Sequence, residues 1–275
     1  MIRFPDCFVL IFGELAVGGF LCLSVPPFQE IERGFYKSSA AVFLTAALAM
    51  IGGKLALLVR TGPPWAPIAL VETGAWVLFT GAAAVYLYSL WGDPYRLRAS
   101  AYLGTLLTGL AALAISASRF AAGALAPAAV LLYPASFAAS AAVLGTSVTG
   151  MLLGHWYLID TGMSLRPLER VLRAFVTALI CQLLLLGIVL ALFAVTAPAS
   201  TGTTLAQLWS MHGPALAARL VLGPGAALGI AALITRTLAI PQTMAATGLF
   251  YIAVLAVAVG EMLSRLLLLR TTLPL

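Results

Sequence analysis

Six ionisable side chains lie inside long hydrophobic segments of this sequence, where a charge is costly. They are three acids and three bases: Glu14, Lys54, Glu72, Arg219, Glu261 and Arg265. A charged group in the hydrocarbon layer costs several kcal/mol unless it is paired or hydrated. A carboxylate can accept a proton, and a lysine or arginine can donate hydrogen bonds to a carbonyl. The set therefore predicts either a polar pocket or a neutralised ion-pair network that locks the helices together.

The depth of these residues follows from the rise of about 1.5 Å per helical residue. Counting along the hydrophobic segments places all six roughly 5–12 Å below the same surface. Lys54 and Glu72 flank one short connection, so they are expected to pair, and Arg265 is expected to extend to the surface by itself. A pocket at this depth would serve a quinone headgroup, a proton path or a transported solute. Its candidate residues are Glu14, Lys54, Glu72, Arg219 and Glu261, with His212 close by.

The two histidines fall near opposite ends of the predicted helices. His155 precedes Asp160, which is expected to cap the following loop or to orient the imidazole. The separation of the two histidines argues against a haem b bound by both. A haem with a single histidine, or with Met211 as second ligand, is the less favoured alternative. The simplest interpretation is an interfacial histidine bonded to a carbonyl or headgroup. The functional alternative is a partner-facing surface at that end: His155, Asp160, Arg166, Arg170 and Arg173.

Familiar catalytic motifs are missing from the sequence. It contains no HExxH, GxSxG or Walker A pattern, and the only pair of histidines is split across the predicted membrane. We therefore predict no catalytic residues of a stand-alone enzyme and no metal site.

Composition identifies the class of protein. Of 275 residues, 62% are hydrophobic and 9% are charged, and the mean hydropathy is +1.07. Soluble domains carry about 25% charged residues. The sequence thus predicts an all-α integral membrane bundle that forms a single domain over residues 1–275. About 20 apolar residues cross a bilayer, which gives eight predicted spans: 7–26, 39–59, 67–91, 99–119, 126–158, 171–196, 213–235 and 242–268.

Small residues and prolines inside the spans predict local packing. Gly150 and Gly154 form a GxxxG step, as do Gly225 and Gly229, and such steps let helix backbones approach closely. Pro224 is expected to kink the seventh span.

Positive charge sets the predicted orientation. The connections 27–38, 92–98, 159–170 and 236–241 hold more basic residues than the opposite side, which has Arg3, Arg60, Arg119 and Arg270. The positive-inside rule then places both termini outside. We expect a multi-pass protein of a bacterial inner (cytoplasmic) membrane. The net charge of +6 is assigned to topology and lipid headgroups rather than to nucleic acid.

The stretch Gly260-Glu261-Met262-Leu263-Ser264-Arg265 resembles the end of NrfD/PsrC-like membrane anchors of respiratory reductase complexes. The eight predicted spans, short loops and outside termini resemble that family as well. The resemblance implies a quinone-binding subunit without haem that passes electrons to an iron–sulfur partner chain. Some members carry a functional histidine in the first helix, where this chain has Glu14, so no site residue is taken from the family.

Three hypotheses of function follow. The first is a quinone-interacting subunit of a respiratory or electron-transfer complex, bound to iron–sulfur or cytochrome chains in the lipid bilayer. The second is a structural anchor or assembly subunit without ligand chemistry. The third is a small-solute transporter, for which broken helices and inverted repeats would be the usual signs.

Overall fold

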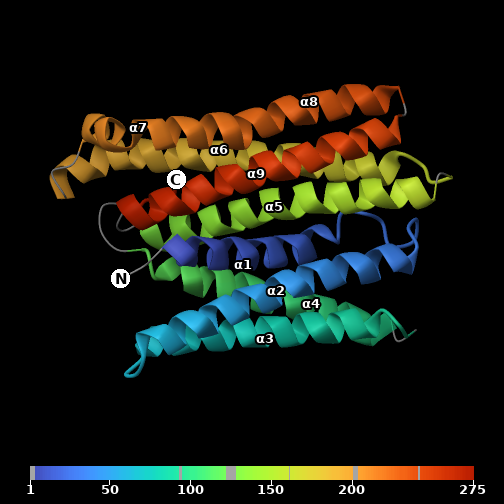
Figure 1. Cartoon of the computed structure of the whole chain (residues 1–275), viewed down its shortest axis with the longest axis horizontal. Coiled ribbons are helices and arrows are strands. Elements are labelled where there is room, and N and C mark those ends of the chain that lie inside the picture. The colour runs from blue at the N-terminus through green and yellow to red at the C-terminus, as the bar shows by residue number, and fades with distance from the viewer. Residues whose placement is uncertain (1–3, 93–94, 122–127, 161, 201–203, 241) are drawn as a thin grey trace.

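The computed structural model describes residues 4–92, 95–121, 128–160, 162–200, 204–240 and 242–275. Every regular element within these ranges is a helix, as the composition predicts (Figure 1). The first four are α1 (Phe4–Cys22), α2 (Arg33–Thr61), α3 (Pro67–Ser89) and α4 (Tyr95–Ser118). The remainder are α5 (Ala129–Ile159), α6 (Arg166–Ser200), α7 (Leu205–Leu220), the π-helical turn η1 (Val221–Gly225), α8 (Ala226–Ala239) and α9 (Thr243–Thr271).

Eight helical segments in the described ranges are long and apolar enough to cross a membrane. Each overlaps one of the eight predicted spans, and α7, η1 and α8 together form the seventh. This confirms an all-helical chain with eight segments able to span a membrane. Residues 126 and 127 of the predicted fifth span, and Arg3, lie outside the described residues.

The seventh span begins eight residues earlier than predicted, at Leu205 rather than residue 213. Thr204 and Gln207 form a capping box, in which each side chain accepts a backbone N–H of the other. Pro214 lies inside α7 without ending it. His212 is therefore in the interior of α7, and its predicted place at the start of the helix was wrong.

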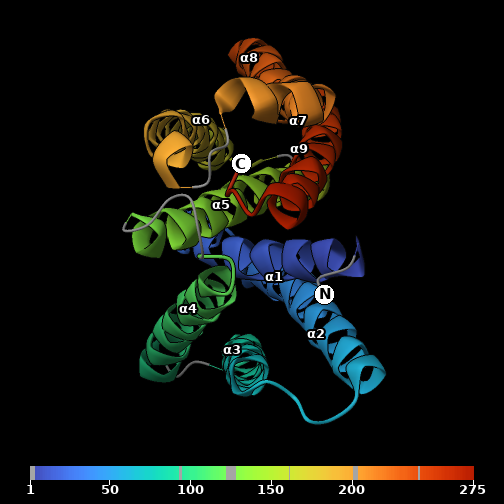
Figure 2. The ribbon, with the colours of Figure 1, turned by 90° about the vertical axis from the view of Figure 1, so that its left-hand side faces the viewer.

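The helices form two halves on either side of a central pair, α1 and α5. Viewed along the helices, α2, α3 and α4 gather on one side of this pair and α6, α7–α8 and α9 on the other (Figure 2). A half-turn about the centre of this view would bring α2 near α6, α3 near α7–α8, and α4 near α9. This four-plus-four arrangement is a feature of how the helices pack and is visible only in the structure.

Glycines allow the two central helices, α1 and α5, to approach each other closely. At the crossing of α1 and α5, a Cβ on Gly18 would overlap the backbone carbonyl of Ala141, and a Cβ on Gly145 would overlap the backbone of Gly18. Backbone atoms cannot move aside as a flexible side chain can. The central crossing therefore requires glycine at both positions.

Replacing Gly18 with alanine should destabilise the fold by about 1–3 kcal/mol or more, because an overpacked contact displaces backbone. Gly81→Ala is the matched control, since a Cβ there meets nothing within 4 Å. It should leave stability unchanged or raise it by up to about 1 kcal/mol. Thermal melts of both variants in the same detergent would test the pair, and equal melting temperatures would contradict the account of the crossing.

One of the two predicted GxxxG steps packs a helix pair. Gly150 lies against Phe250 and Gly154 against Thr247 of α9, so that a side chain at either position would overlap its neighbour. Gly229 instead faces open space, so the second step was wrongly predicted to pack helices. The predicted kink at Pro224 is confirmed: η1 contains Pro224, and Gly223 has non-helical backbone angles (φ −79°, ψ −106°).

Both ends of the described chain lie at one end of the bundle, with the end of α2, the start of α3, the end of α6 and the start of α7 (Figure 1). We call this the terminal end. The ends of α1, α3, α5 and α8 and the starts of α2, α4, α6 and α9 lie at the other end, which we call the loop end.

Candidate functional site

The six buried charges form two separate clusters rather than one. Lys54 and Glu72 belong to the first half, where they meet Arg119. Glu14, Arg219, Glu261 and Arg265 join α1 to the helices of the second half. We name these groups the Glu72 cluster and the Arg265 network.

The buried charges lie at different distances from the ends of their own helices. Glu72 is five residues after the start of α3, whereas Glu14 is ten residues after the start of α1 and Arg219 fourteen after the start of α7. At about 1.5 Å per residue these positions are roughly 8, 15 and 21 Å from the helix ends. A helix end does not mark a membrane surface, so the common depth predicted from hydropathy stays a prediction.

The Glu72 cluster surrounds one carboxylate with donors. Glu72 Oε2 contacts both the Lys54 ammonium and Arg119 Nη1, and the predicted Lys54–Glu72 pair is confirmed. Ser116 Oγ donates to Glu72 Oε1 at 2.7 Å, and Trp76 Nε1 donates to Ser116 Oγ at 2.9 Å. The Glu72 side chain is 1% exposed and that of Arg119 is 31% exposed. Within the Glu72 cluster, two cations therefore contact one carboxylate, and one of them, Arg119, is partly open.

A cavity of about 410 Å³ borders this cluster at the terminal end of the first half. Its polar wall includes Lys54, Glu72 and Arg119. Its apolar wall comes from α1, α2 and the start of α3, and Asp6 and Arg60 also line it. The cavity is therefore apolar on one side and charged on the other, where three cations and two carboxylates leave a net positive charge. That division suits a ligand with an oxygen acceptor on an apolar body.

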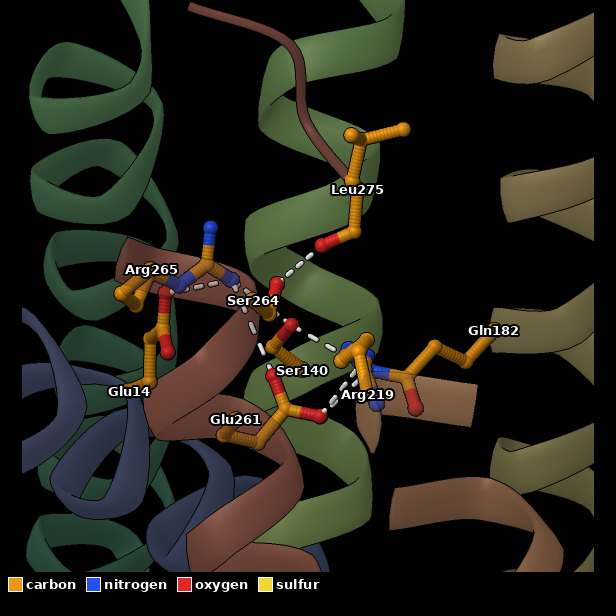
Figure 3. A network of polar contacts seen from close by, with 8 residues as sticks. All are labelled: Glu14, Ser140, Gln182, Arg219, Glu261, Ser264, Arg265 and Leu275. Atoms are coloured by element: carbon orange, nitrogen blue, oxygen red, sulfur yellow. Dashed lines mark hydrogen bonds and ion pairs between the residues drawn. The ribbon is translucent and has the colours of Figure 1, made fainter. Parts of the chain in front are cut away.

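The Arg265 network is sealed inside the bundle (Figure 3). Arg265 Nη2 lies 2.8 Å from Glu14 Oε1 and donates to Ser140 Oγ at 2.7 Å. Glu261 Oε1 accepts from Arg219 Nη2 at 3.2 Å and from Gln182 Nε2 at 2.7 Å. The guanidinium of Arg265 also stands over the Phe137 ring, 4.2 Å from its centroid. Five helices, α1, α5, α6, α7 and α9, thus share one charge-balanced network.

Arg265 does not extend to the surface, so that prediction was wrong. Its side chain is 0% exposed and turns inward to Glu14. The network is incompletely bonded: neither oxygen of Glu14 accepts a hydrogen bond from the described residues, and the Nε and Nη1 atoms of both arginines have no such partner. Contact between Arg265 and Glu14 is thus an ion pair without hydrogen-bond geometry. Buried groups of this kind are costly to leave uncompensated.

Several members of the two clusters were missed by the sequence analysis. Arg119 follows the end of α4 and was counted only as a charge outside the helices. Ser116 and Ser140 are short polar residues of a kind that also bonds within its own helix, so nothing marked them. Gln182 did carry a signal, since it interrupts the apolar run Ile180-Cys181-Gln182-Leu183-Leu184. A polar amide in such a run requires a partner inside the bundle.

His212 is not brought to the Glu72 cluster. It lies on α7 in the second half. It does not line the cavity beside Glu72, and it takes no part in the contacts described for the Arg265 network. The structure thus assembles Lys54 and Glu72 in one place, Glu14, Arg219 and Glu261 in another, and leaves His212 apart from both.

The predicted partner-facing residues lie at the loop end. His155, Arg166, Arg170 and Arg173 have exposed side chains there. Asp160 accepts the backbone N–H of Gly162 at 3.2 Å, which confirms its predicted capping of the loop. Arg170 lies 3.8 Å from Glu30 in an exposed ion pair, a kind worth little in stability.

Neither a metal-binding group nor a similar known protein identifies the function of the two clusters. Among the described residues, no group of three or more His, Cys, Asp or Glu side chains is placed to hold a metal ion. Comparisons with protein-family models, curated proteins and solved structures find no match for this chain. The geometry of the two clusters is therefore the basis for any proposal.

Proposed function

We propose that this chain is an integral membrane subunit of an electron-transfer complex, and that the cavity beside Glu72 holds the headgroup of a quinone. One observation carries the proposal: a cavity of about 410 Å³ that is apolar on one side and has Lys54, Glu72 and Arg119 among the charged groups of the other. A quinone has an apolar body and carbonyl oxygens that accept hydrogen bonds. The cavity offers both the apolar surface and the donors.

The chemistry proposed for the cluster is oxidation of a hydroquinone. Loss of two electrons and two protons converts the hydroquinone to the quinone. Lys54 and Arg119 donate to the ligand oxygens and stabilise the negative charge that develops as a hydroxyl loses its proton. Glu72 accepts that proton as general base, releases it toward the terminal end, and then accepts the second proton in the same way. Arg119 is partly exposed and borders the route by which the proton leaves toward the terminal end.

The electrons go to a redox partner chain, of the iron–sulfur or cytochrome class. Electron transfer weakens steeply with distance, so this partner is proposed to dock at the terminal end, close to the cavity. His155 and the exposed arginines of the loop end then serve anionic headgroups or a further subunit. With the positive loop end inside, the cavity faces the outer side of a bacterial cytoplasmic membrane.

Blocking the cavity tests the proposal. Ala69 lines the cavity, so Ala69→Trp should fill it and raise the KM for a short-chain quinol by about tenfold or more. Ala84→Trp is the matched control on α3, because Ala84 is exposed and does not line the cavity. The readout is quinol-dependent reduction by the assembled complex. If both variants keep wild-type kinetics, the cavity is not the quinone site.

A structural anchor is the second candidate, and the Arg265 network favours it. Its four charged side chains are fully buried, balanced in charge and shared by α1, α7 and α9. Under this hypothesis, substitutions in either cluster lower the amount of assembled complex. Under the quinone hypothesis, substitutions that line the cavity lower turnover while assembly is retained.

A further inference from the structure

A second cavity, of about 470 Å³, lies between α6 and α7 in the other half of the bundle. Leu186 and Leu190 line it from α6. From α7 it receives Leu205, Ala206, Trp209, Leu216, Arg219 and Leu220, and Leu275 closes one side. The two helices make little direct contact with each other, so this groove replaces a helix–helix interface.

The groove is apolar along its whole length. Arg219 is its one charged residue, but the Arg219 guanidinium turns away, toward Glu261 and the contact of Gly223 with Gly260. Only the hydrocarbon stem of Arg219 is left to line the groove. The Nε and Nη1 atoms of Arg219, although without a hydrogen-bond partner among the described residues, are shielded from solvent, so the deep end presents almost no accessible donor to an occupant.

The two ends of the groove differ. At the mouth, Leu205 is 44% exposed and Trp209 is 57% exposed. The mouth adjoins the capped start of α7 at Thr204, just before the segment Leu205–Ala239 that is long and apolar enough to cross a membrane. At the deep end Leu216 is buried. A molecule must therefore enter with its apolar part first and keep its polar part at the membrane surface.

We propose that this groove binds the acyl chain of a membrane phospholipid, which completes the packing of α6 against α7. A phospholipid has the required orientation, with its chain in the groove and its headgroup at the level of Thr204. A quinone with its headgroup at the deep end would leave its carbonyls without donors. This inference is independent of the proposed function, because it concerns the other half of the bundle.

Retained lipid is the readout of the first test. The full chain is purified in mild detergent, and bound phospholipid is counted by native mass spectrometry. Ala206 is exposed at the mouth, so Ala206→Phe should fill the groove without disturbing the core. Wild type and the control Ala232→Phe, on an exposed face of α8 away from the groove, should each retain roughly one phospholipid, and Ala206→Phe should retain almost none.

A second variant and a second measurement keep the proposal testable if Ala206→Phe folds poorly. Leu205→Trp fills the mouth from a different position, and melting is measured with and without added phosphatidylglycerol vesicles. Added lipid should raise the melting temperature of wild type and of Ala232→Phe, because a ligand that binds only the folded state stabilises it. It should not raise that of the filled variants. Lipid-free wild type, equal retention by all variants, or a retained quinone in place of phospholipid would each overturn the inference.

Discussion

Substituting Arg265 with methionine should destabilise the protein by about 3–5 kcal/mol, the cost of removing one partner from a buried ion pair. Arg265 is the described cation in contact with Glu14, at 2.8 Å, and both side chains are 0% exposed. Its loss leaves a carboxylate without compensation in the centre of the bundle. Ser140 loses its guanidinium donor at the same time. Thermal melting and the monodisperse fraction in detergent would measure the loss.

Two further variants separate the charge from the volume of the side chain. Glu14→Gln removes the uncompensated charge, so the double variant Glu14→Gln with Arg265→Met should recover much of the stability lost in Arg265→Met alone. Arg270→Met, on an exposed face of the same helix, should melt like wild type. If the double variant melts no higher than Arg265→Met, the ion pair is not what the network contributes.

Glu72→Gln should lower kcat for quinol-dependent reduction by about 10²–10⁴-fold, the usual contribution of a general base. The amide keeps the size of the side chain and can still accept from Ser116, but Lys54 and Arg119 lose their carboxylate partner, so the variant should also be less stable than wild type. Glutamine cannot take a proton from the ligand hydroxyl. Steady-state kinetics of the complex, normalised to the amount assembled, would measure the effect.

The control for this experiment is Glu32→Gln, an exposed carboxylate at the loop end, which should turn over like wild type. Unchanged kcat in Glu72→Gln would exclude Glu72 as proton acceptor. Loss of assembled complex with normal turnover of the remainder would instead favour the structural-anchor hypothesis. The outcome thus separates the two candidate functions.

Local sequence was sufficient to predict the membrane-spanning helices. Runs of apolar residues and breakers such as Pro63-Pro64 mark where the spans lie, because backbone groups in a bilayer must bond within a helix. Pairing of Lys54 with Glu72 was also predictable, since a short connection places both near one helix end. The start of α7 was not, because a capping box at Thr204 extends the helix through Gly213 and Pro214.

Division of the charges into two clusters was beyond the sequence. Which charges meet depends on how each helix is rotated and on which helices are neighbours, and neither follows from hydropathy. Glu14 and Glu72 both face the interior of the bundle. They nevertheless have different neighbours, because α1 contacts α9 whereas α3 contacts α2 and α4. Arg265 is an example. Its place near a helix end indicated an arginine that reaches the surface, but α1 packs beside α9, so Arg265 points inward to Glu14.

The two clusters differ in the property that decides what each can do. The Arg265 network is balanced in charge and sealed, which suits the joining of two halves. The Glu72 cluster borders a cavity at the terminal end, and the charged groups that line this cavity leave a net positive charge. An excess cation beside an open volume is the arrangement expected of a binding site, so the proposed function rests on this cluster.

Photolabelling with an azido-quinone tests most directly whether the cavity beside Glu72 binds a quinone. The complex is illuminated with the labelled quinone, and the modified peptides of this chain are mapped by mass spectrometry, with unlabelled quinone as competitor. The account predicts competable labelling of the segments that line the first cavity, around Lys54 to Glu72 and around Arg119. Labelling confined to the groove of residues 205–220, or no competable labelling of this chain, would contradict it.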